Sequence, residues 1–146
     1  MGGSCASREF QPGRCFTVRM PYGKDFITSL TQFCVDASIR MAWFSAIGAV
    51  SSATIGAYDQ KQQVYITFKE ERALEILSCA GNISLMDGKP FVHAHVTLSD
   101  EQGKTIGGHL FSETPIFACE VNIQELNAQP FERAHDSQTG LKLWKI

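Results

Sequence analysis

Three of the four histidines in this sequence, His93, His95 and His109, lie close together along the chain. His93 and His95 are two residues apart, so on an extended strand their imidazoles leave the same face. They belong to the run 91–98 (FVHAHVTL), and His109 belongs to the run 105–111 (TIGGHLF). Both runs are rich in β-branched and apolar residues, and a polar segment separates them. This pattern predicts a β-hairpin that carries all three histidines.

The register of that hairpin decides whether the imidazoles converge. If His95 is directly opposite His109, Ser99 pairs with Thr105 across a five-residue loop, and all three imidazoles share one face. A four-residue loop would send His109 to the other face, unless Gly107-Gly108 forms a bulge that restores the phase. We therefore expect the five-residue loop if the histidines form a site.

Zinc is the metal that such a set of histidines would suit. Zinc accepts imidazole nitrogen, and three histidine ligands leave one tetrahedral position open for water, whose pKa such a centre can lower to about 7. The alternative is that His93 and His95 are surface or hydrogen-bonding residues of a half-buried strand. Spacing alone leaves both interpretations open. His135, in a polar segment, is expected to be an ordinary exposed histidine.

The elements that must position the histidines are one helix and several strands. From Lys24 to Arg40 apolar residues recur at intervals of three and four, as in an amphipathic helix, and Asp25 is placed to favour its N-terminus. Strands are predicted at 15–20, 41–47, 50–58, 64–68, 73–79, 83–85, 116–123 and 141–146.

Glycine-containing segments predict where these strands end. We expect a junction near Gly48, an interruption at Gly81-Asn82 and a hairpin turn at Asp87-Gly88. The run 116–123 is apolar enough to be buried on both faces. One helix against a largely antiparallel sheet is an α+β fold.

Composition and charge restrict the function classes. With 44% hydrophobic and 19% charged residues, the chain has ordinary globular usage, and we expect a flexible tail at 1–14 and a single domain at 15–146. The net charge of −2 gives no general attraction to phosphate, and the basic residues are scattered. The glycines Gly48, Gly56, Gly81, Gly107 and Gly108 have no phosphate-loop spacing and are better explained as bulges and close strand approaches. Direct DNA binding by this chain is therefore disfavoured.

The cysteines and the N-terminus favour a cytoplasmic protein. Five widely spaced cysteines without a C-x-x-C pair predict neither a disulfide framework nor a zinc finger, so we expect reduced thiols. The N-terminus lacks the pattern of a secretory signal, and Gly2 gives only a faint myristoylation pattern because Ser7 is one position late. No apolar run approaches the roughly 18 residues of a membrane span.

Four ordered motifs resemble one known family. They lie at 42–50 (AWFSAIGAV), 75–84 (EILSCAGNIS), 88–98 (GKPFVHAHVTL) and 107–110 (GGHL). They are similar to the plants-and-prokaryotes conserved domain, also called the domain of unknown function 296, and the resemblance runs from about residue 16 to residue 131. In plants this domain follows an AT-hook in nuclear proteins, whereas in bacteria and archaea it stands alone.

The resemblance implies a sheet with one main helix, a homotrimer, a DNA-binding label and, in some prokaryotic members, a bound metal. It thereby favours a divalent metal, zinc by preference, at His93, His95 and His109. A homotrimer also agrees with the need of an open sheet with long apolar strands to cover its edges or faces.

The sequence departs from the plant pattern in two places. The nearest segment to an AT-hook, 12–14 (PGR), has the wrong order and no basic flanks. The plant motif Gly-Arg-Phe-Glu-Ile-Leu, associated with partner proteins, is present only in outline as 72–77 (RALEIL), which makes Glu75, Ile76 and Leu77 candidates for a partner contact. Glu75 could instead orient an imidazole, or simply face solvent.

Three functions remain open. The first is a trimeric metal-binding domain with a DNA-associated or regulatory role, in which a partner protein supplies the contact with DNA. The second is an enzyme that uses a three-histidine zinc site to activate water for hydrolysis or hydration. The third is an interaction module in which the metal only staples the sheet. No acid–base pair accompanies the histidines, so no substrate follows from the sequence.

Overall fold

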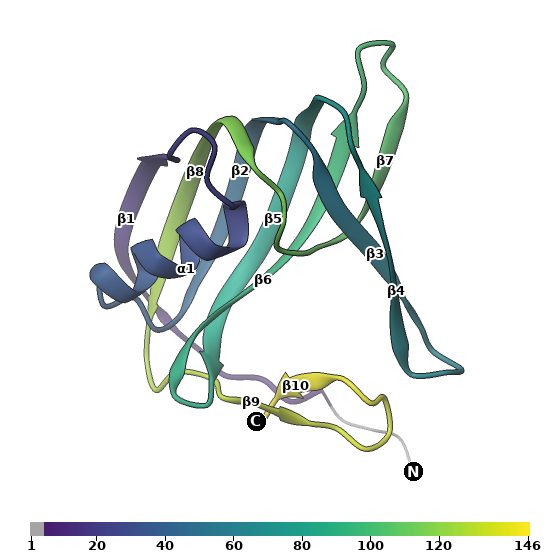
Figure 1. The fold of residues 1–146 in the computed structure, drawn as a ribbon. Coiled ribbons are helices and arrows are strands. Elements are labelled where there is room, and N and C mark those ends of the chain that lie inside the picture. Colours follow the sequence, from purple (N-terminus) through teal and green to yellow (C-terminus); the bar gives the residue numbers. More distant parts are fainter. Residues whose placement is uncertain (1–4) are drawn as a thin grey trace.

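The computed structural model describes residues 5–146, which form one helix and ten strands (Figure 1). The elements are β1 (Gln11–Arg19), α1 (Phe26–Asp36), β2 (Ala42–Val50), β3 (Ala53–Asp59), β4 (Val64–Glu70), β5 (Leu74–Met86), β6 (Lys89–Ser99), β7 (Thr105–Leu110), β8 (Ile116–Asn127), β9 (Arg133–His135) and β10 (Lys142–Trp144). This is the predicted α+β class.

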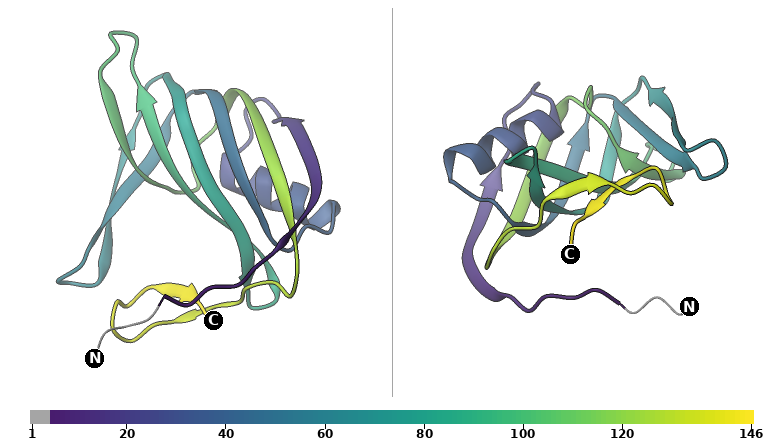
Figure 2. Two further views of the ribbon diagram at one scale, coloured as in Figure 1. Left: turned by 180° about the vertical axis from the view of Figure 1, so that it is seen from behind. Right: turned by 90° about the horizontal axis from the view of Figure 1, so that it is seen from below.

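Eight of the strands form one sheet in the order β1-β8-β2-β5-β6-β7-β3-β4, and every pair is antiparallel. The helix α1 packs on one face of this sheet, as Figures 1 and 2 show. The strands β3 and β4 splay away from β6 as an arm, and the separate β9–β10 hairpin lies below the sheet. This splay opens the space beside the histidine hairpin.

The core lies between α1 and the sheet. Phe26, Leu30 and Cys34 project from one side of the helix and are fully buried. Asp25 caps the helix as predicted, because its carboxylate accepts a hydrogen bond from the Thr28 N–H at 2.8 Å. Such a cap satisfies one of the N–H groups that the first turn leaves unpaired.

The helix ends at Asp36, before the predicted Arg40. Ser38 takes a positive φ of 56°, and the N–H of Ile39 then bonds to the Cys34 carbonyl at 2.8 Å. This left-handed ending satisfies carbonyls of the last turn that would otherwise be unpaired.

Gly48 and Gly81 do not end strands, but the bulges and close strand approaches predicted for the glycines are confirmed at both positions. Gly48 lies inside β2 at a bulge, with φ 149°, and a side chain there would collide with the Ala118 carbonyl of β8. The predicted interruption at Gly81 is also wrong, because β5 is continuous and a side chain at Gly81 would collide with the His93 carbonyl of β6. Both glycines permit close strand approach instead of ending a strand.

The turn between β5 and β6 is confirmed at Asp87-Gly88. Both residues have positive φ, 53° and 74°. This is the conformation of the two-residue type I′ turn, whose twist matches that of the flanking strands.

The sheet face turned away from α1, called the open face below, is only partly covered. The predicted burial of the run 116–123 on both faces is wrong for the single chain, because Val121 and Ile123 are buried whereas Phe117 is 59% exposed. Trp43, Ile47 and Leu77 are also at least half exposed, at 50%, 59% and 51%. The open face therefore carries an apolar surface that one chain does not bury.

The N-terminal strand begins earlier than predicted. β1 starts at Gln11, inside the stretch 1–14 that was expected to form a tail, and the guanidinium of Arg8 lies 4.7 Å from the centre of the Phe131 ring. Residues 1–4, including Gly2 of the faint myristoylation pattern, lie outside the described residues. Among residues 5–146 no helix is long and apolar enough to cross a membrane. All five cysteines are free, and Cys34, Cys79 and Cys119 are buried.

Candidate metal centre and adjoining cavity

The β6–β7 hairpin has the register that brings the histidines together. His95 pairs directly with His109, and the ladder continues to Ser99 opposite Thr105. Of the loop lengths that the sequence left open, the structure therefore has the five-residue loop, and no bulge at Gly107-Gly108 is needed. Because His93 lies two residues before His95, its imidazole leaves the same face of the sheet.

Asp100 holds the loop that fixes this register. Its carboxylate accepts hydrogen bonds from the backbone N–H groups of Gln102 and Lys104, at 3.0 and 2.8 Å. The Arg72 guanidinium also donates to this carboxylate, with Nη1 2.9 Å from Oδ2 of Asp100. The hydrogen bond from Lys104 and these further contacts lower the pKa of Asp100 below its ordinary value, so its carboxylate is charged at neutral pH.

The three imidazoles form a compact triangle, called the histidine triad below. Their ring centres are 5.1 Å apart for His93 and His95, 5.0 Å for His93 and His109, and 5.3 Å for His95 and His109. One nitrogen of each ring lies within 4.8 Å of the others. Zinc–nitrogen bonds of about 2.0–2.1 Å in tetrahedral geometry put ligand nitrogens about 3.3 Å apart. The side chains would therefore rotate to bring their nitrogens to that spacing around an ion.

The surroundings keep two of these rings neutral. Burial, together with the Arg133 guanidinium and the neighbouring imidazoles, lowers the pKa of His93 to about 4. Burial, with His95 and Arg133, lowers the pKa of His109 to about 4 as well. A neutral imidazole has a nitrogen lone pair free for a metal, so these rings are in ligating form at neutral pH.

Tyr65, on β4, contacts the triad from the arm. Its hydroxyl lies 3.5 Å from Nδ1 of His109, and the two ring centres are 4.8 Å apart. If Nδ1 carries the proton and faces the tyrosine oxygen, Nε2 of His109 is left for a metal. Burial raises the pKa of Tyr65, so the hydroxyl is neutral.

Arg133, on β9, contacts the triad from the other side, and sequence reasoning missed it. Its Nη2 lies 3.4 Å from Nδ1 of His93 and donates to the Asn82 side chain at 2.8 Å. Its Nε donates to Ser84 at 2.9 Å, and its Nη1 donates to the Lys142 carbonyl at 3.0 Å. The residue is only 9% exposed. These contacts place a positive charge beside His93.

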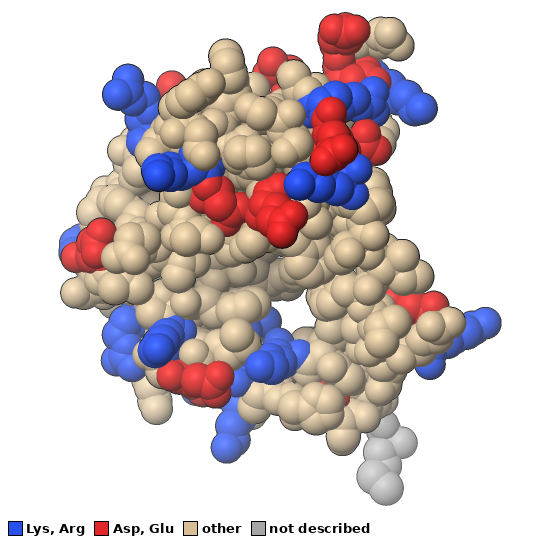
Figure 3. Space-filling model, in the orientation of Figure 1, with Lys and Arg blue, Asp and Glu red and all other residues tan. Residues whose placement is uncertain are grey.

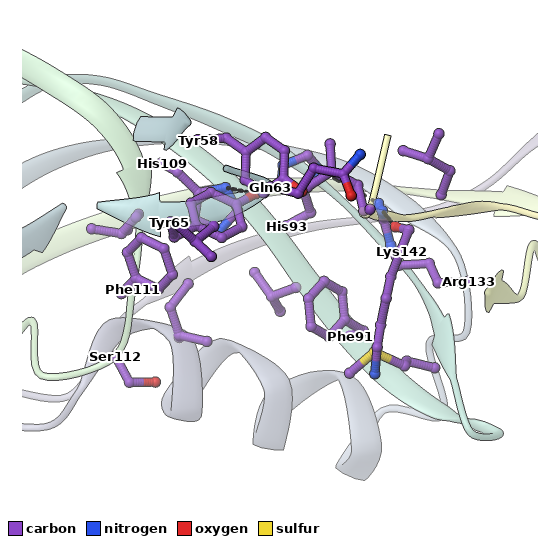
Figure 4. A pocket seen from close by; sticks show the side chains of 18 residues that line it. Tyr58, Gln63, Tyr65, Phe91, His93, His109, Phe111, Ser112, Arg133 and Lys142 are labelled. Carbon is purple, nitrogen blue, oxygen red and sulfur yellow. Dashed lines mark hydrogen bonds between the residues drawn. The ribbon is translucent and has the colours of Figure 1, made fainter. Parts of the chain in front are cut away.

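A cavity of about 540 Å³ adjoins the triad. It lies where β6 diverges from the β3–β4 arm, and His93 and His109 both line it. Figure 3 shows a hollow between the arm and the rest of the sheet, surrounded mostly by uncharged residues. In Figure 4 the rings of Tyr65, His109 and Phe111 gather at one end of the cavity, and Phe91 lies beside Arg133 at the other.

The chain segment between β9 and β10 helps to close the cavity. The hydroxyl of Tyr58, on β3, donates to the Thr139 carbonyl at 2.8 Å. The side chain of Gln63, at the tip of the arm, donates to the Gln138 carbonyl at 3.2 Å. The arm and the C-terminal hairpin, far apart in sequence, therefore join across the cavity. A volume of this size suits a small organic ligand.

The three residues of the outline partner motif lie elsewhere. Glu75 is exposed and pairs with Ser99, four residues along β6 from His95, which is about 13 Å at the usual rise of a strand. It therefore lies too far away to orient an imidazole of the triad directly. Ile76 is buried and Leu77 is on the open face, so of these side chains Glu75 and Leu77 are available to a partner.

His135 is exposed on β9, as expected, and does not join the triad.

Neither Arg133 nor Tyr65 could be assigned to the site from spacing. Arg133 is 40 residues from His93 and Tyr65 is 44 residues from His109 in sequence. The only local signal was an arginine near Phe131 in a segment that otherwise resembled a loop.

Solved structures with this fold come from archaea and bacteria. A metal-containing protein from Archaeoglobus fulgidus is 46% identical, with a TM-score of 0.93, over 97% of this chain and 100% of that one. A plant- and prokaryote-conserved protein from Pyrococcus horikoshii is 34% identical, with a TM-score of 0.91, over 97% and 98%. A candidate DNA-binding protein from Ralstonia eutropha JMP134 is 27% identical, with a TM-score of 0.80, over 89% and 90%.

Longer proteins also contain a related segment. The bifunctional protein GlmU of Synechococcus sp. (strain JA-3-3Ab) is 32% identical over 129 residues, which is 87% of this chain but 20% of that protein. GlmU of the strain JA-2-3B'a(2-13) is 30% identical over 129 residues and 19% of its length. The chain thus spans about a fifth of the length of these curated relatives.

The family follows from a match over most of the chain. The sequence profile of the Plants and Prokaryotes Conserved (PCC) domain covers residues 7–127, which include the sheet, α1 and the histidine triad. This range contains all four motifs on which the sequence resemblance was based. The chain belongs to the Plants and Prokaryotes Conserved (PCC) domain family.

Proposed function

We propose that this PCC-domain protein binds one divalent transition metal, zinc by preference, through His93, His95 and His109. The observation that carries the proposal is the convergence of three ligand nitrogens within 4.8 Å on one face of the β6–β7 hairpin. The similar Archaeoglobus fulgidus protein, described as metal-containing, supports it.

The donor set fits zinc. Three neutral imidazoles are nitrogen ligands of borderline softness, and no Asp or Glu of residues 5–146 joins them in the cluster. A calcium or magnesium site would require oxygen ligands instead. The bound ion would supply a Lewis acid at the wall of the cavity. The chain itself would hold His109 through Tyr65.

An enzyme of hydrolysis or hydration is the second candidate function. The adjoining cavity favours it, because a metal that only stapled strands would not need a ligand-sized space beside it. The β6–β7 strands are also joined already by their own ladder, so the fold does not require the metal to connect them.

We also propose that the protein is a homotrimer and that any role at DNA operates through a partner protein. The apolar residues of the open face support self-association, since Ile47 and Leu77 remain at least half exposed in one chain. The similar protein from Ralstonia eutropha JMP134 is described as a candidate DNA-binding protein, but the net charge of −2 gives this chain no general attraction to phosphate. Among the basic residues near the N-terminus, Arg14 already forms an ion pair with Glu125, with its Nε 2.7 Å from the carboxylate. Its charge is therefore less available to a phosphate.

Cobalt titration tests the metal proposal directly. Co²⁺ substitutes for zinc and absorbs visible light with an intensity that depends on coordination geometry. We expect saturation at one Co²⁺ per chain with the absorption of a low-coordinate site, displaced by zinc, and loss of that signal in His109→Ala. The matched control is His135→Ala, because His135 is exposed and outside the triad. A signal unchanged by His109→Ala would exclude the three-histidine site.

A further inference from the structure

The cavity beside the triad contains basic groups but no acidic ones. Its 18 lining residues include Arg133, Lys142 and two of the histidines. None of the described residues that line it is Asp or Glu. This contrasts with the whole chain, whose acidic residues outnumber its basic ones by 15 to 13. The positive charges of Arg133 and Lys142, without a negative charge in the lining, therefore favour an anion in the cavity.

Arg133 is a buried cation without an acidic partner. It is 9% exposed, and no ion pair joins it to Asp or Glu among residues 5–146. The adjacent Glu132 points elsewhere, since its carboxylate accepts from the Gly88 N–H at 3.1 Å. Burying a charge without a counter-charge is unfavourable, so a ligand that supplied the missing negative charge would be stabilised.

The guanidinium has hydrogen-bonding capacity left. An arginine has five N–H donors, and four contacts are formed, to Ser84, Asn82, the Lys142 carbonyl and His93. The contact with His93 spans 3.4 Å, beyond the usual range for an N–H donor. One Nη1 hydrogen has no partner among the described residues. Arg133 can thus donate to an anion without losing the bonds that hold it in place.

The rest of the cavity is apolar and aromatic. Phe91, Phe111, Leu141 and Leu143 contribute to its walls, and Tyr65 contributes a ring. Phe91 lies beside the cation, since the Arg133 guanidinium carbon is 5.3 Å from the centre of its ring. Apolar walls with a small number of polar or charged groups are the usual form of a small-molecule site.

We propose that the cavity binds a small molecule that joins an anionic group, a carboxylate or a phosphate-type group, to an apolar body, and that Arg133 holds the anion. The ligand would lie against His93 and His109, beside the metal of the proposed function. The inference deepens that function by naming a ligand class. It does not depend on the ion, because the cavity and Arg133 are formed by the chain alone.

Calorimetric titration with three probes tests the proposal. The probes are phenylbutyrate, its neutral amide phenylbutyramide, and phenylphosphonate, each added to the protein as purified and after treatment with a chelator. We expect the better anion to bind at least about tenfold more tightly than the amide, because a charge-assisted hydrogen bond is lost in the amide. Comparison of the two anions identifies the carboxylate or phosphate-type ligand.

Two variants assign the effect to the cavity. Arg133→Gln should remove the preference for the anions over the amide, whereas Arg40→Gln, at an exposed arginine outside the cavity, should have no effect. If Arg133→Gln fails to fold, Lys142→Glu decides, because it adds a negative charge to the lining of the cavity at an exposed position, in the residue whose carbonyl accepts from Arg133. Its control is Lys145→Glu, which is also exposed and lies outside the lining. Lys142→Glu should weaken the binding of the anions more than that of the amide.

The outcomes separate this inference from the metal proposal. An anion preference that survives chelation and is lost in Arg133→Gln or Lys142→Glu supports the inference, even if the protein proves to bind no metal. Equal binding of anion and amide, no binding of any probe, or a preference that both variants leave intact would overturn it. A preference abolished by chelation would also overturn it, because the metal and not Arg133 would then hold the anion.

Discussion

His95 and His109 face each other directly across the β6–β7 ladder, and this pairing determines the whole site. A shift of one residue would send His109 to the opposite face of the sheet. The loop held by Asp100 prevents such a shift, and the arm brings Tyr65 against His109. The candidate centre is therefore a consequence of hairpin register, supported by contacts from distant parts of the chain.

Removal of the Tyr65 hydroxyl should weaken metal binding. In Tyr65→Phe the ring remains packed against His109, but the oxygen that can accept from Nδ1 is lost. We expect metal affinity to fall by about tenfold, the lower end of the effect of outer contacts on metal ligands. Competition with a chromophoric chelator measures this. Tyr22→Phe is the control, since Tyr22 is 74% exposed and outside the cavity; equal affinities in both variants would exclude a role for the hydroxyl.

The stability of the metal-free protein should depend on pH through His93 and His109. Both have a pKa of about 4 when folded, against 6.5 ordinarily, so between these values the unfolded chain binds more protons. The free energy of unfolding should therefore decrease as pH falls from 6.5 to 4, by roughly 2 kcal/mol after allowance for the partial exposure of both rings.

Urea denaturation after chelation, repeated across this pH range, measures the effect. The double variant His93→Gln/His109→Gln should show a shallower dependence, because it removes both groups. His135→Gln is the control and should retain the wild-type slope. A wild-type stability that stayed constant or increased as the pH fell would contradict the assigned environment of the two histidines.

Substitution on the open face should prevent self-association. Ile47→Glu places a charge on an apolar surface that is 59% exposed in one chain. We expect the wild type to have a mass of about three times 16.1 kDa by light scattering, and Ile47→Glu to be mainly monomeric. Ile66→Glu is a matched control, because Ile66, on the β3–β4 arm, is 60% exposed. A wild-type protein of 16.1 kDa at micromolar concentration would refute the trimer.

The features predicted correctly from the sequence are those set by hydrophobic periodicity and turn residues within a short segment of the chain. Sequence reasoning predicted the cap at Asp25 and the turn at Asp87-Gly88 and identified the register in which the histidines converge, because each depends on residues close in the chain. It predicted bulges and close strand approaches at Gly48 and Gly81, which are confirmed, but it also placed strand ends there, since a glycine alone does not show whether the chain turns or a neighbouring backbone approaches.

The walls of the site were beyond sequence reasoning for a different reason. Arg133 and Tyr65 reach the histidines only through the packing of the C-terminal hairpin and the arm, and no spacing rule connects residues 40 or more apart. The cavity has the same origin. The exposed Phe117 was misjudged because an apolar strand indicates burial without saying whether the same chain provides the cover.

The isolated protein should not bind DNA sequence-specifically at physiological salt. The basic residues near the N-terminus are Arg8, Arg14, Arg19 and Lys24, and two of them are engaged, Arg14 with Glu125 and Arg8 over Phe131. Few phosphates could be neutralised, so any binding should be weak and should fall steeply with salt. Fluorescence anisotropy at about 150 mM salt tests this. Sub-micromolar affinity that survived non-specific competitor DNA would show that the charge argument is wrong.

Metal analysis of the purified chain tests the central claim most directly. Inductively coupled plasma mass spectrometry after gel filtration should find about one zinc or similar divalent metal per chain in the wild type and in His135→Ala. Each of His93→Ala, His95→Ala and His109→Ala should have a sharply lower metal content and remain folded by circular dichroism. Full stoichiometric metal in His109→Ala, or a wild type that binds no divalent metal even after zinc is supplied, would contradict the three-histidine centre.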